Sequence, residues 1–242
     1  MSEFGTGPAP IALALDGPDL HTIGQWALQC GPYVSTMKVG LEAFLRDGGD
    51  AVLHVREKSG GRDVFLDLKL HDIPNTVAGA ARAVAHLAPT YLTVHASGGA
   101  AMVRAAVAEL PDTLITAVTV LTSLHPDDLA DIGLLGPSID AACRLAVLAV
   151  NAGARAVVCS PHEVAAIRAE VATEIVLITP GVRPAGSAAG DQARVATPEQ
   201  ALHDGADLLV IGRPITADPT PGAAAAQLAR SLEGLRSSLT KR

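Results

Sequence analysis

The chain has 242 residues, which suits one large domain or two small ones and is long enough to bury a sizeable core. Hydrophobic residues make up 49% of the chain but aromatic residues only 2%, so the core must be built mainly from Ala, Val, Leu and Ile. The formal charge of -7 and the lack of a Lys/Arg cluster with interleaved aromatic residues argue against a nucleic-acid-binding protein.

The composition also argues against a membrane or secreted protein. Mean hydropathy is +0.32, yet no apolar run reaches the roughly 18 residues that a membrane-spanning helix needs. Residues 1–10 lack a basic segment followed by an apolar one, so we expect no secretory signal and interpret this stretch as a disordered lead before a domain over residues 11–242. The three cysteines, an odd number without C-x-x-C spacing, predict reduced thiols in a cytoplasmic protein.

Short apolar runs alternate with longer segments of helical spacing along the whole chain. The predicted strands are Ile11–Leu15, Thr36–Val39, Val64–Leu68, Tyr91–Val94, Leu114–Val120, Ala156–Cys159, Ile175–Ile178 and Leu208–Ile211. The predicted helices are Leu20–Cys30, Leu41–Lys58, Thr76–Leu87, Ala100–Leu110, Asp140–Ala152, His162–Ala172, Pro198–Asp204 and Pro221–Leu239. Eight such units predict an α/β fold of the (β/α)₈ TIM-barrel type. A doubly wound open sheet is the alternative, but Asp16-Gly17-Pro18-Asp19 after the first strand is not a Gly-rich phosphate turn.

The most informative stretch ends the third predicted strand and reads Asp67-Leu68-Lys69-Leu70-His71-Asp72-Ile73-Pro74-Asn75-Thr76. Alternate side chains of an extended segment share a face, so Asp67 and Lys69 emerge together. Pro74 fits the first turn of a helix, which places the charges where a strand gives way to a helix. Taken alone, the motif is also explained by a solvated ion pair of little energetic value.

Polar residues at the other strand ends favour a site over an inert ion pair. In a barrel the active site lies at the carboxyl ends of the strands. Asp16 follows the first strand, although it would also suit the cap of the next helix. Lys38 lies inside an apolar run, where an unpaired ammonium is costly, and Asp67 is its natural partner. Thr122 and Ser123 follow the fifth strand.

The last two strand ends predict a site for a phosphate group. Gly181 and Gly212 let backbone N–H groups approach an anion, and Arg213 can form two parallel hydrogen bonds with it. Arg183 and Gln192 flank a polar loop, residues 185–192, that is long enough to fold over a ligand. We therefore expect a small phosphorylated substrate. His71 and His95 are interpreted as structural histidines, and no residue cluster has a zinc-binding spacing, so no metal is expected.

These residues resemble those of the orotidine 5'-phosphate decarboxylase family. The resemblance runs from Asp16 to Thr216, and the long central motif alone is specific. Its parts are Asp16, Lys38, Asp67 to Thr76, Thr122, Thr179-Pro180-Gly181-Val182-Arg183, Gly190-Asp191-Gln192 and Val210-Ile211-Gly212-Arg213-Pro214-Ile215-Thr216. The resemblance implies a cofactor-free lyase in a homodimer, which converts orotidine 5'-phosphate to UMP and carbon dioxide in the last step of de novo pyrimidine biosynthesis.

The resemblance also implies roles for single residues. Lys38, Asp67, Lys69 and Asp72 would form the catalytic charge array, with Asp72 contributed across the dimer interface together with Ile73 and Thr76. The substrate-binding residues would be Asp16 and Lys38 at the ribose, Thr122 and Gln192 at the pyrimidine and its closing loop, and Pro180, Arg183, Gly212 and Arg213 around the phosphate. Lys69 would protonate C6 after carbon dioxide leaves.

Two other functions are compatible with parts of this pattern. Sugar-phosphate enzymes similar to 3-keto-gulonate-6-phosphate decarboxylase and hexulose-6-phosphate synthase share D-x-K-x-x-D but use a magnesium-bound enediolate. That chemistry calls for an acidic ligand on the second strand, where this chain has Lys38. A barrel that only binds phosphate is the other alternative, but it has no need for a buried ammonium among carboxylates.

Overall fold

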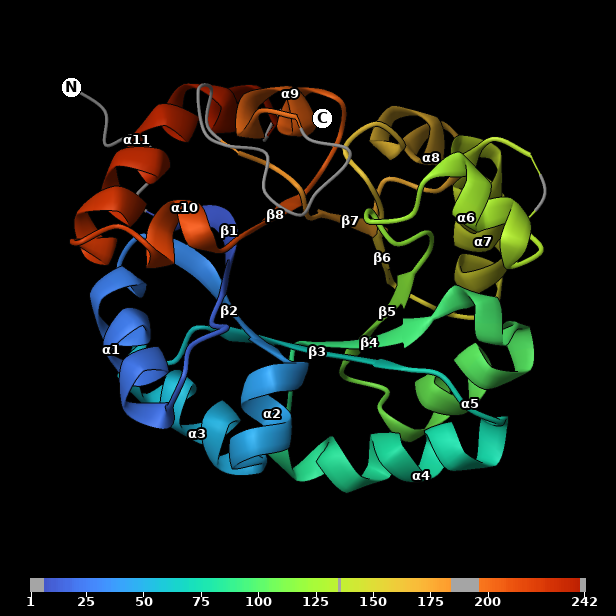
Figure 1. Ribbon diagram of the computed structural model, residues 1–242, viewed down its shortest axis with the longest axis horizontal. Helices are drawn as coiled ribbons and strands as arrows, with labels where there is room; N and C mark the ends of the chain where they lie inside the picture. The colour runs from blue at the N-terminus through green and yellow to red at the C-terminus, as the bar shows by residue number, and fades with distance from the viewer. Residues whose placement is uncertain (1–6, 135, 184–195, 240–242) are drawn as a thin grey trace.

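The computed structural model describes residues 7–134, 136–183 and 196–239. Eight parallel strands form a closed barrel in which each strand pairs with the next and β8 pairs with β1 (Figure 1). The strands are β1 (Ala9–Ala14), β2 (Val34–Gly40), β3 (Asp63–Leu70), β4 (Tyr91–His95), β5 (Leu114–Val118), β6 (Ala156–Val158), β7 (Val176–Thr179) and β8 (Leu208–Ile211). The predicted TIM-barrel architecture is confirmed.

Helices surround the barrel (Figure 1). They are α1 (Leu20–Cys30), α2 (Leu41–Asp47), α3 (Gly49–Lys58), α4 (Pro74–Val84), α5 (Ala100–Glu109), α6 (Pro126–Asp131), α7 (Ser138–Asn151), α8 (Val164–Glu170), α9 (Pro198–His203), α10 (Arg213–Thr216) and α11 (Pro221–Leu239), with 3₁₀ turns η1 (Ala85–Leu87) and η2 (Ala96–Gly98). The prediction of one helix over Leu41–Lys58 is wrong. Gly48 adopts a φ of 62°, which an ordinary residue avoids, and the helix breaks there.

The N-terminal boundary also differs from the prediction. β1 begins at Ala9, so the expected disordered lead of residues 1–10 extends too far into the barrel. Residues 1–6 lie outside the described part of the chain. The cap of α1 is Asp19, whose Oδ1 accepts a hydrogen bond of 2.7 Å from the Thr22 N–H. Asp16 therefore does not serve as the cap that its position allowed.

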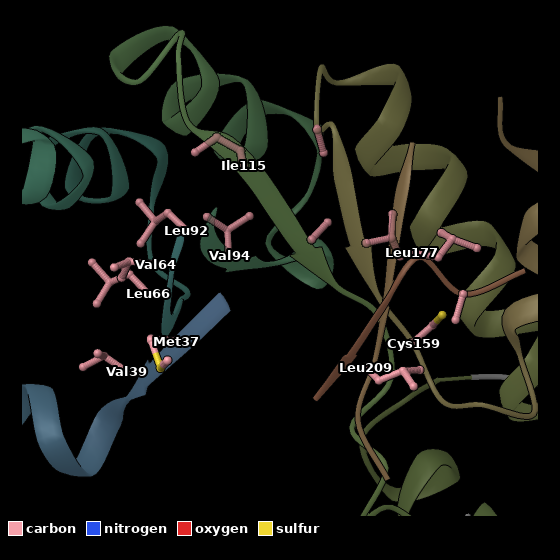
Figure 2. Close-up of a cluster of buried hydrophobic side chains, with 14 of the residues drawn as sticks. Met37, Val39, Val64, Leu66, Leu92, Val94, Ile115, Cys159, Leu177 and Leu209 are labelled. Carbon is pink, nitrogen blue, oxygen red and sulfur yellow. The ribbon is translucent and has the colours of Figure 1, made fainter. Parts of the chain in front are cut away.

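Apolar side chains fill two layers, one on each face of the barrel. Outward-pointing residues pack beneath the helices, and Figure 2 shows part of this layer, with Met37 and Val39 from β2 beside Leu66 from β3 and Val94 from β4. A smaller inner cluster comprises Ala12, Phe65, Ala156, Ile178 and Leu208, with partly buried neighbours that include Tyr91. Because alternate residues of each strand face inward, the polar positions on the inner face lie directly above this cluster.

No helix within the described ranges is long and apolar enough to cross a membrane. All three cysteines are free thiols. Cys30 and Cys159 are buried, whereas Cys143 is only half-buried. Burial raises the pKa of the Cys30 thiol to about 11, which keeps it protonated and unreactive at neutral pH.

Candidate active site

A cavity of about 620 Å³ opens at the carboxyl ends of the strands, where a barrel places its active site. Its volume lies in the range of small-molecule sites. The predicted site residues that line it are Asp16, Lys38, Asp67, Lys69, Thr122, Pro180, Arg183, Gly212 and Arg213. Gln192 lies outside the described residues. The cavity thus brings together residues from Asp16 to Arg213, which are far apart along the chain.

Three charged side chains lie in contact on one wall of the cavity, and we call Lys38, Asp67 and Lys69 the charged cluster. The Lys69 Nζ donates to both carboxylate oxygens of Asp67 at 2.9 Å. The Lys38 Nζ lies 3.3 Å from Asp67 Oδ2 and 3.7 Å from Asp16 Oδ1. The side chain of Lys38 is 10% exposed and that of Asp67 is 11% exposed. Two ammonium groups therefore flank one nearly buried carboxylate.

This arrangement keeps Asp67 ionised. Burial by itself raises the pKa of the Asp67 carboxyl. The charges of Lys38 and Lys69, with hydrogen bonds from Lys69 and Thr93, outweigh burial, so this pKa lies below its usual value. Because this pKa is lower in the folded protein than in the unfolded chain, the carboxylate adds stability above the ordinary carboxyl pKa, and this stability is lost as the pH falls through the lowered pKa.

Lys69 has an unusual backbone conformation, with a φ of 49° in the left-handed region. A residue with a Cβ rarely adopts this conformation unless its surroundings hold it there, and such outliers concentrate at functional sites. The Lys69 N–H donates a hydrogen bond of 2.7 Å to Thr93 Oγ1, which also donates to Asp67 Oδ1 at 3.1 Å. Thr93 was not predicted as a site residue, because nothing in the sequence of its own strand distinguishes it from a core residue.

The opposite wall of the cavity carries the groups expected to bind an anion. Gly181 has a φ of 77°, which favours glycine, and it follows β7 next to Pro180. Gly212 and Arg213 follow β8 and line the same space. The phosphate-binding residues predicted after strands seven and eight therefore face the charged cluster across one cavity.

Apolar side chains, none of them predicted as site residues, form another part of the cavity lining. Phe65, Val118, Val158 and Val210 line it together with Ala14. They occupy inward-facing positions of their strands. Because alternate residues of a strand face the same side, this alternation could have predicted them from the sequence. Thr122 and Ser123 both line the cavity, so either hydroxyl is placed to meet a ligand.

The other predicted catalytic residue, Asp72, is not among the residues that line this cavity. Asp72, Ile73 and Thr76 are exposed, and Ile73 retains 65% of its accessible surface. The Asp72 Oδ1 accepts a hydrogen bond of 2.6 Å from the Ile73 N–H at the start of α4. Within one chain, therefore, the structure separates these three residues from the charged cluster.

The two histidines of this region contact each other. The rings of His71 and His95 have centroids 5.2 Å apart with an interplanar angle of 34°. Burial lowers the pKa of His95, and the charges of His71 and Lys69 lower it further. Neither ring is among the residues that line the cavity, which accords with a structural role. Within the described residues, no three His, Cys, Asp or Glu side chains gather as a metal-binding group.

Gly40 is a second position that the sequence analysis did not identify. A Cβ at Gly40 would lie 2.9 Å from both Asp16 Oδ1 and Lys38 Nζ. The glycine therefore leaves the room in which these two side chains approach each other. In the sequence, Met37-Lys38-Val39-Gly40 shows only a glycine two residues after a lysine, and the approach of Asp16 to this position arises only in the folded barrel.

Replacing Gly40 by alanine is expected to lower kcat/KM by about 10- to 100-fold, because a small displacement of reacting or binding groups has effects of that size. The free energy of unfolding should change little, since the added methyl group meets only the ends of two flexible side chains. Steady-state kinetics and thermal denaturation measure the two effects. Gly79→Ala is the control, because its Cβ would meet no atom closer than 3.9 Å. Activity of Gly40→Ala equal to that of this control would contradict the expectation.

Comparisons with known proteins agree with this geometry. A model of the orotidine 5'-phosphate decarboxylase / HUMPS family matches residues 9–228. An orotidine 5'-phosphate decarboxylase of Thermobifida fusca is 66% identical over 227 residues, which cover 93% of this chain and 96% of that protein. One from Frankia casuarinae is 53% identical, over 93% of this chain and 88% of that protein.

A solved structure extends the likeness to three dimensions. The crystal structure of orotidine 5'-phosphate decarboxylase from Lactobacillus acidophilus matches with a TM-score of 0.78 at 34% identity, covering 92% of this chain and 98% of that chain. The family model, the similar sequences and the similar barrel all indicate the same family. The chain therefore belongs to the orotidine 5'-phosphate decarboxylase / HUMPS family.

Proposed function

We propose that this protein is a carboxy-lyase that converts orotidine 5'-phosphate to UMP and carbon dioxide, the last step of de novo UMP biosynthesis. The observation that carries the proposal is the charged cluster, in which an ammonium group reaches the cavity that Gly181, Gly212 and Arg213 also line. The cavity volume of about 620 Å³ suits a nucleoside monophosphate. Membership of the family supports the same substrate.

The proposed mechanism begins when the bond between C6 and the carboxylate carbon breaks and its electron pair stays on C6. That lone pair lies in the plane of the pyrimidine ring and cannot delocalise into the π system, so it needs a nearby positive charge. The Lys69 Nζ supplies the charge and then transfers a proton to C6. The neutral amine recovers a proton from water, which completes the cycle without a cofactor.

The surroundings of Lys69 suit this role. Its Nζ contacts the Asp67 carboxylate at 2.9 Å, and opposite charges about 4 Å apart attract by roughly 4 kcal/mol at an effective dielectric near 20. This attraction holds the Lys69 Nζ at the wall of the cavity. Asp67 would lie near the departing carboxylate, where repulsion between like charges favours its loss. Phosphate contacts at Arg183, Gly212 and Arg213, far from C6, would supply binding energy that lowers the barrier.

The position of Lys38 argues against the magnesium-dependent sugar-phosphate chemistry that other members of such a family use. The Lys38 Nζ lies within 3.7 Å of the Asp16 carboxylate and 3.3 Å of the Asp67 carboxylate. A divalent cation would need these carboxylates as ligands and would meet the ammonium group there. A pair of carboxylates already neutralised by lysine has little affinity for magnesium.

The proposal includes a homodimer in which Asp72 reaches the active site of the neighbouring subunit, with Ile73 and Thr76 beside it. The exposure of these three residues supports it, because within the described part of the chain they are not among the residues that line the cavity with the charged cluster. Two further apolar side chains, Leu41 at 45% and Leu45 at 79% exposed, belong to α2 at the same end of the barrel. Exposed apolar groups at this end of the barrel suit contact with a second copy. A cytoplasmic location is also proposed, supported by the free thiols.

Ultraviolet absorbance tests the proposed reaction directly, because decarboxylation changes the chromophore of the pyrimidine ring. Purified protein mixed with orotidine 5'-phosphate should show this change at the same rate with and without a chelating agent. Absence of turnover would refute the decarboxylase function. Turnover that disappears with the chelator and returns with Mg²⁺ would favour a metal-dependent enzyme instead.

A further inference from the structure

β3 is irregular where it passes β4, directly beside the charged cluster. The two strands pair at Leu66 with Leu92 and next at Leu70 with Val94. β3 therefore has two more residues than β4 between these pairs, which is a β-bulge. The bulge interrupts the ladder of backbone hydrogen bonds at Asp67 and Lys69. Some other group must bind the backbone there and hold Lys69 in its left-handed conformation.

The Thr93 hydroxyl is that group. Thr93 is completely buried on β4, and its Oγ1 accepts the 2.7 Å hydrogen bond from the Lys69 N–H. The same hydroxyl donates its own hydrogen to Asp67 Oδ1 at 3.1 Å. A hydroxyl has one hydrogen and two lone pairs, so it can make both bonds at once. Thr93 thus links the backbone of Lys69 to the carboxylate of Asp67.

We propose that Thr93 is a positioning residue for the decarboxylation: its hydroxyl holds the bulge of β3 in the form that directs the Lys69 Nζ and the Asp67 carboxylate into the cavity. Thr93 does not line the cavity, so it acts through these two residues and not on the substrate. This inference rests on the proposed function, because its kinetic tests measure the decarboxylation. Its structural part, the bond from the Lys69 N–H to Thr93, stands independently of the reaction.

Valine has nearly the shape of threonine but no hydroxyl, so Thr93→Val removes both hydrogen bonds and leaves the Lys69 N–H without its buried acceptor. We expect kcat to fall about 10- to 100-fold with little change in KM, because the loss affects the alignment of the reacting groups more than binding. Calorimetric binding of UMP should persist. A Thr93→Val variant with the kcat of the unaltered protein would overturn the proposal.

Thr116 provides a matched control. It lies directly opposite Thr93 in the register of β4 and β5 and is likewise completely buried. Its hydroxyl donates a hydrogen bond of 2.8 Å to the Leu114 carbonyl of its own strand. Thr116→Val therefore makes the same chemical change at the same depth without touching the bulge. An equal loss of kcat in both valine variants would show a general packing effect and contradict the proposal.

A second pair of variants decides the question even where Thr93→Val does not fold. Thr93→Ser and Thr93→Ala both lack the γ-methyl group, and they differ only in the hydroxyl. We expect the serine variant to retain most of the activity and the alanine variant to lose as much kcat as the valine variant. Equal activity of the serine and alanine variants would exclude a role for the hydroxyl.

Amide hydrogen exchange at Lys69, followed by NMR, separates this inference from the proposed function. Exchange should be slow in the unaltered protein and in Thr93→Ser, and faster in Thr93→Ala, because only the first two retain the acceptor. Unaltered protein that shows no decarboxylation would refute the proposed function while the exchange rates still report on the bond. Equal exchange rates in the serine and alanine variants would refute the positioning role itself.

Discussion

Replacing Lys69 by alanine is expected to lower the turnover of orotidine 5'-phosphate by at least roughly 10⁴-fold. General acid catalysis contributes about 10²- to 10⁴-fold and electrostatic stabilisation of developing charge a further 10²- to 10³-fold, and the Lys69 ammonium is proposed to supply both. Binding of UMP should remain measurable, because Gly212 and Arg213, which are proposed to bind the phosphate, line another part of the cavity. The variant should therefore separate catalysis from binding.

Absorbance assays for turnover and calorimetry for UMP binding measure the two properties. Lys58→Ala is a suitable control, since Lys58 ends α3 and its Nζ lies 3.6 Å from the exposed Glu57 carboxylate. This control should have unchanged activity, because exposed ion pairs contribute little. A Lys69→Ala variant with more than a tenth of the normal kcat would show that another group protonates C6, and loss of UMP binding would show that Lys69 serves mainly to bind.

The barrel was predictable because its elements are local and strongly patterned. α1 and β8 have the bounds that were predicted for them, Leu20–Cys30 and Leu208–Ile211. Each is a continuous run of one periodicity between clear breaks, and α1 begins after a capping aspartate. The short helices α6 and α10 were not predicted, because segments of one or two turns are too short to show a helical period in their apolar residues.

The charged side of the site was predictable for a different reason. An ammonium group in an apolar strand requires a partner, and the order of the strands places Lys38 of β2 next to Asp67 of β3. Lys69 follows from the alternation of side chains along one strand. Charged side chains are costly to bury without a partner, so each buried charge in a predicted strand indicates an opposite charge nearby.

Thr93 and Gly40 could not be found in this way. The bulge that gives Thr93 its role arises from the register between two strands, with Leu70 paired to Val94, and register between parallel strands is not encoded in either strand alone. The role of Gly40 depends on the side chains of Asp16 and Lys38, whose ends both lie 2.9 Å from the point that a Cβ would occupy at this position. Both are properties of the assembled barrel.

Asp72 raises the question of how many subunits form one active site, and mixing two inactive variants answers it. In the proposed dimer, each site of Lys69→Ala lacks its own lysine, and each site of Asp72→Ala lacks the aspartate of the neighbouring subunit. A mixed dimer then contains one site with Lys69 from its own chain and Asp72 from the other. Both parent variants should be inactive, yet their mixture should regain activity.

Random exchange of subunits at equal concentrations predicts about a quarter of the normal activity, because half of the dimers are mixed and each has one intact site. Subunit exchange is verified with one variant carrying an affinity tag, and turnover is followed by absorbance. The exposed position of Asp72, outside the cavity of its own chain, is the physical reason to expect recovery. A mixture that exchanges subunits but stays inactive would show that Asp72 acts within its own chain, which would require the segment after β3 to move toward the cavity.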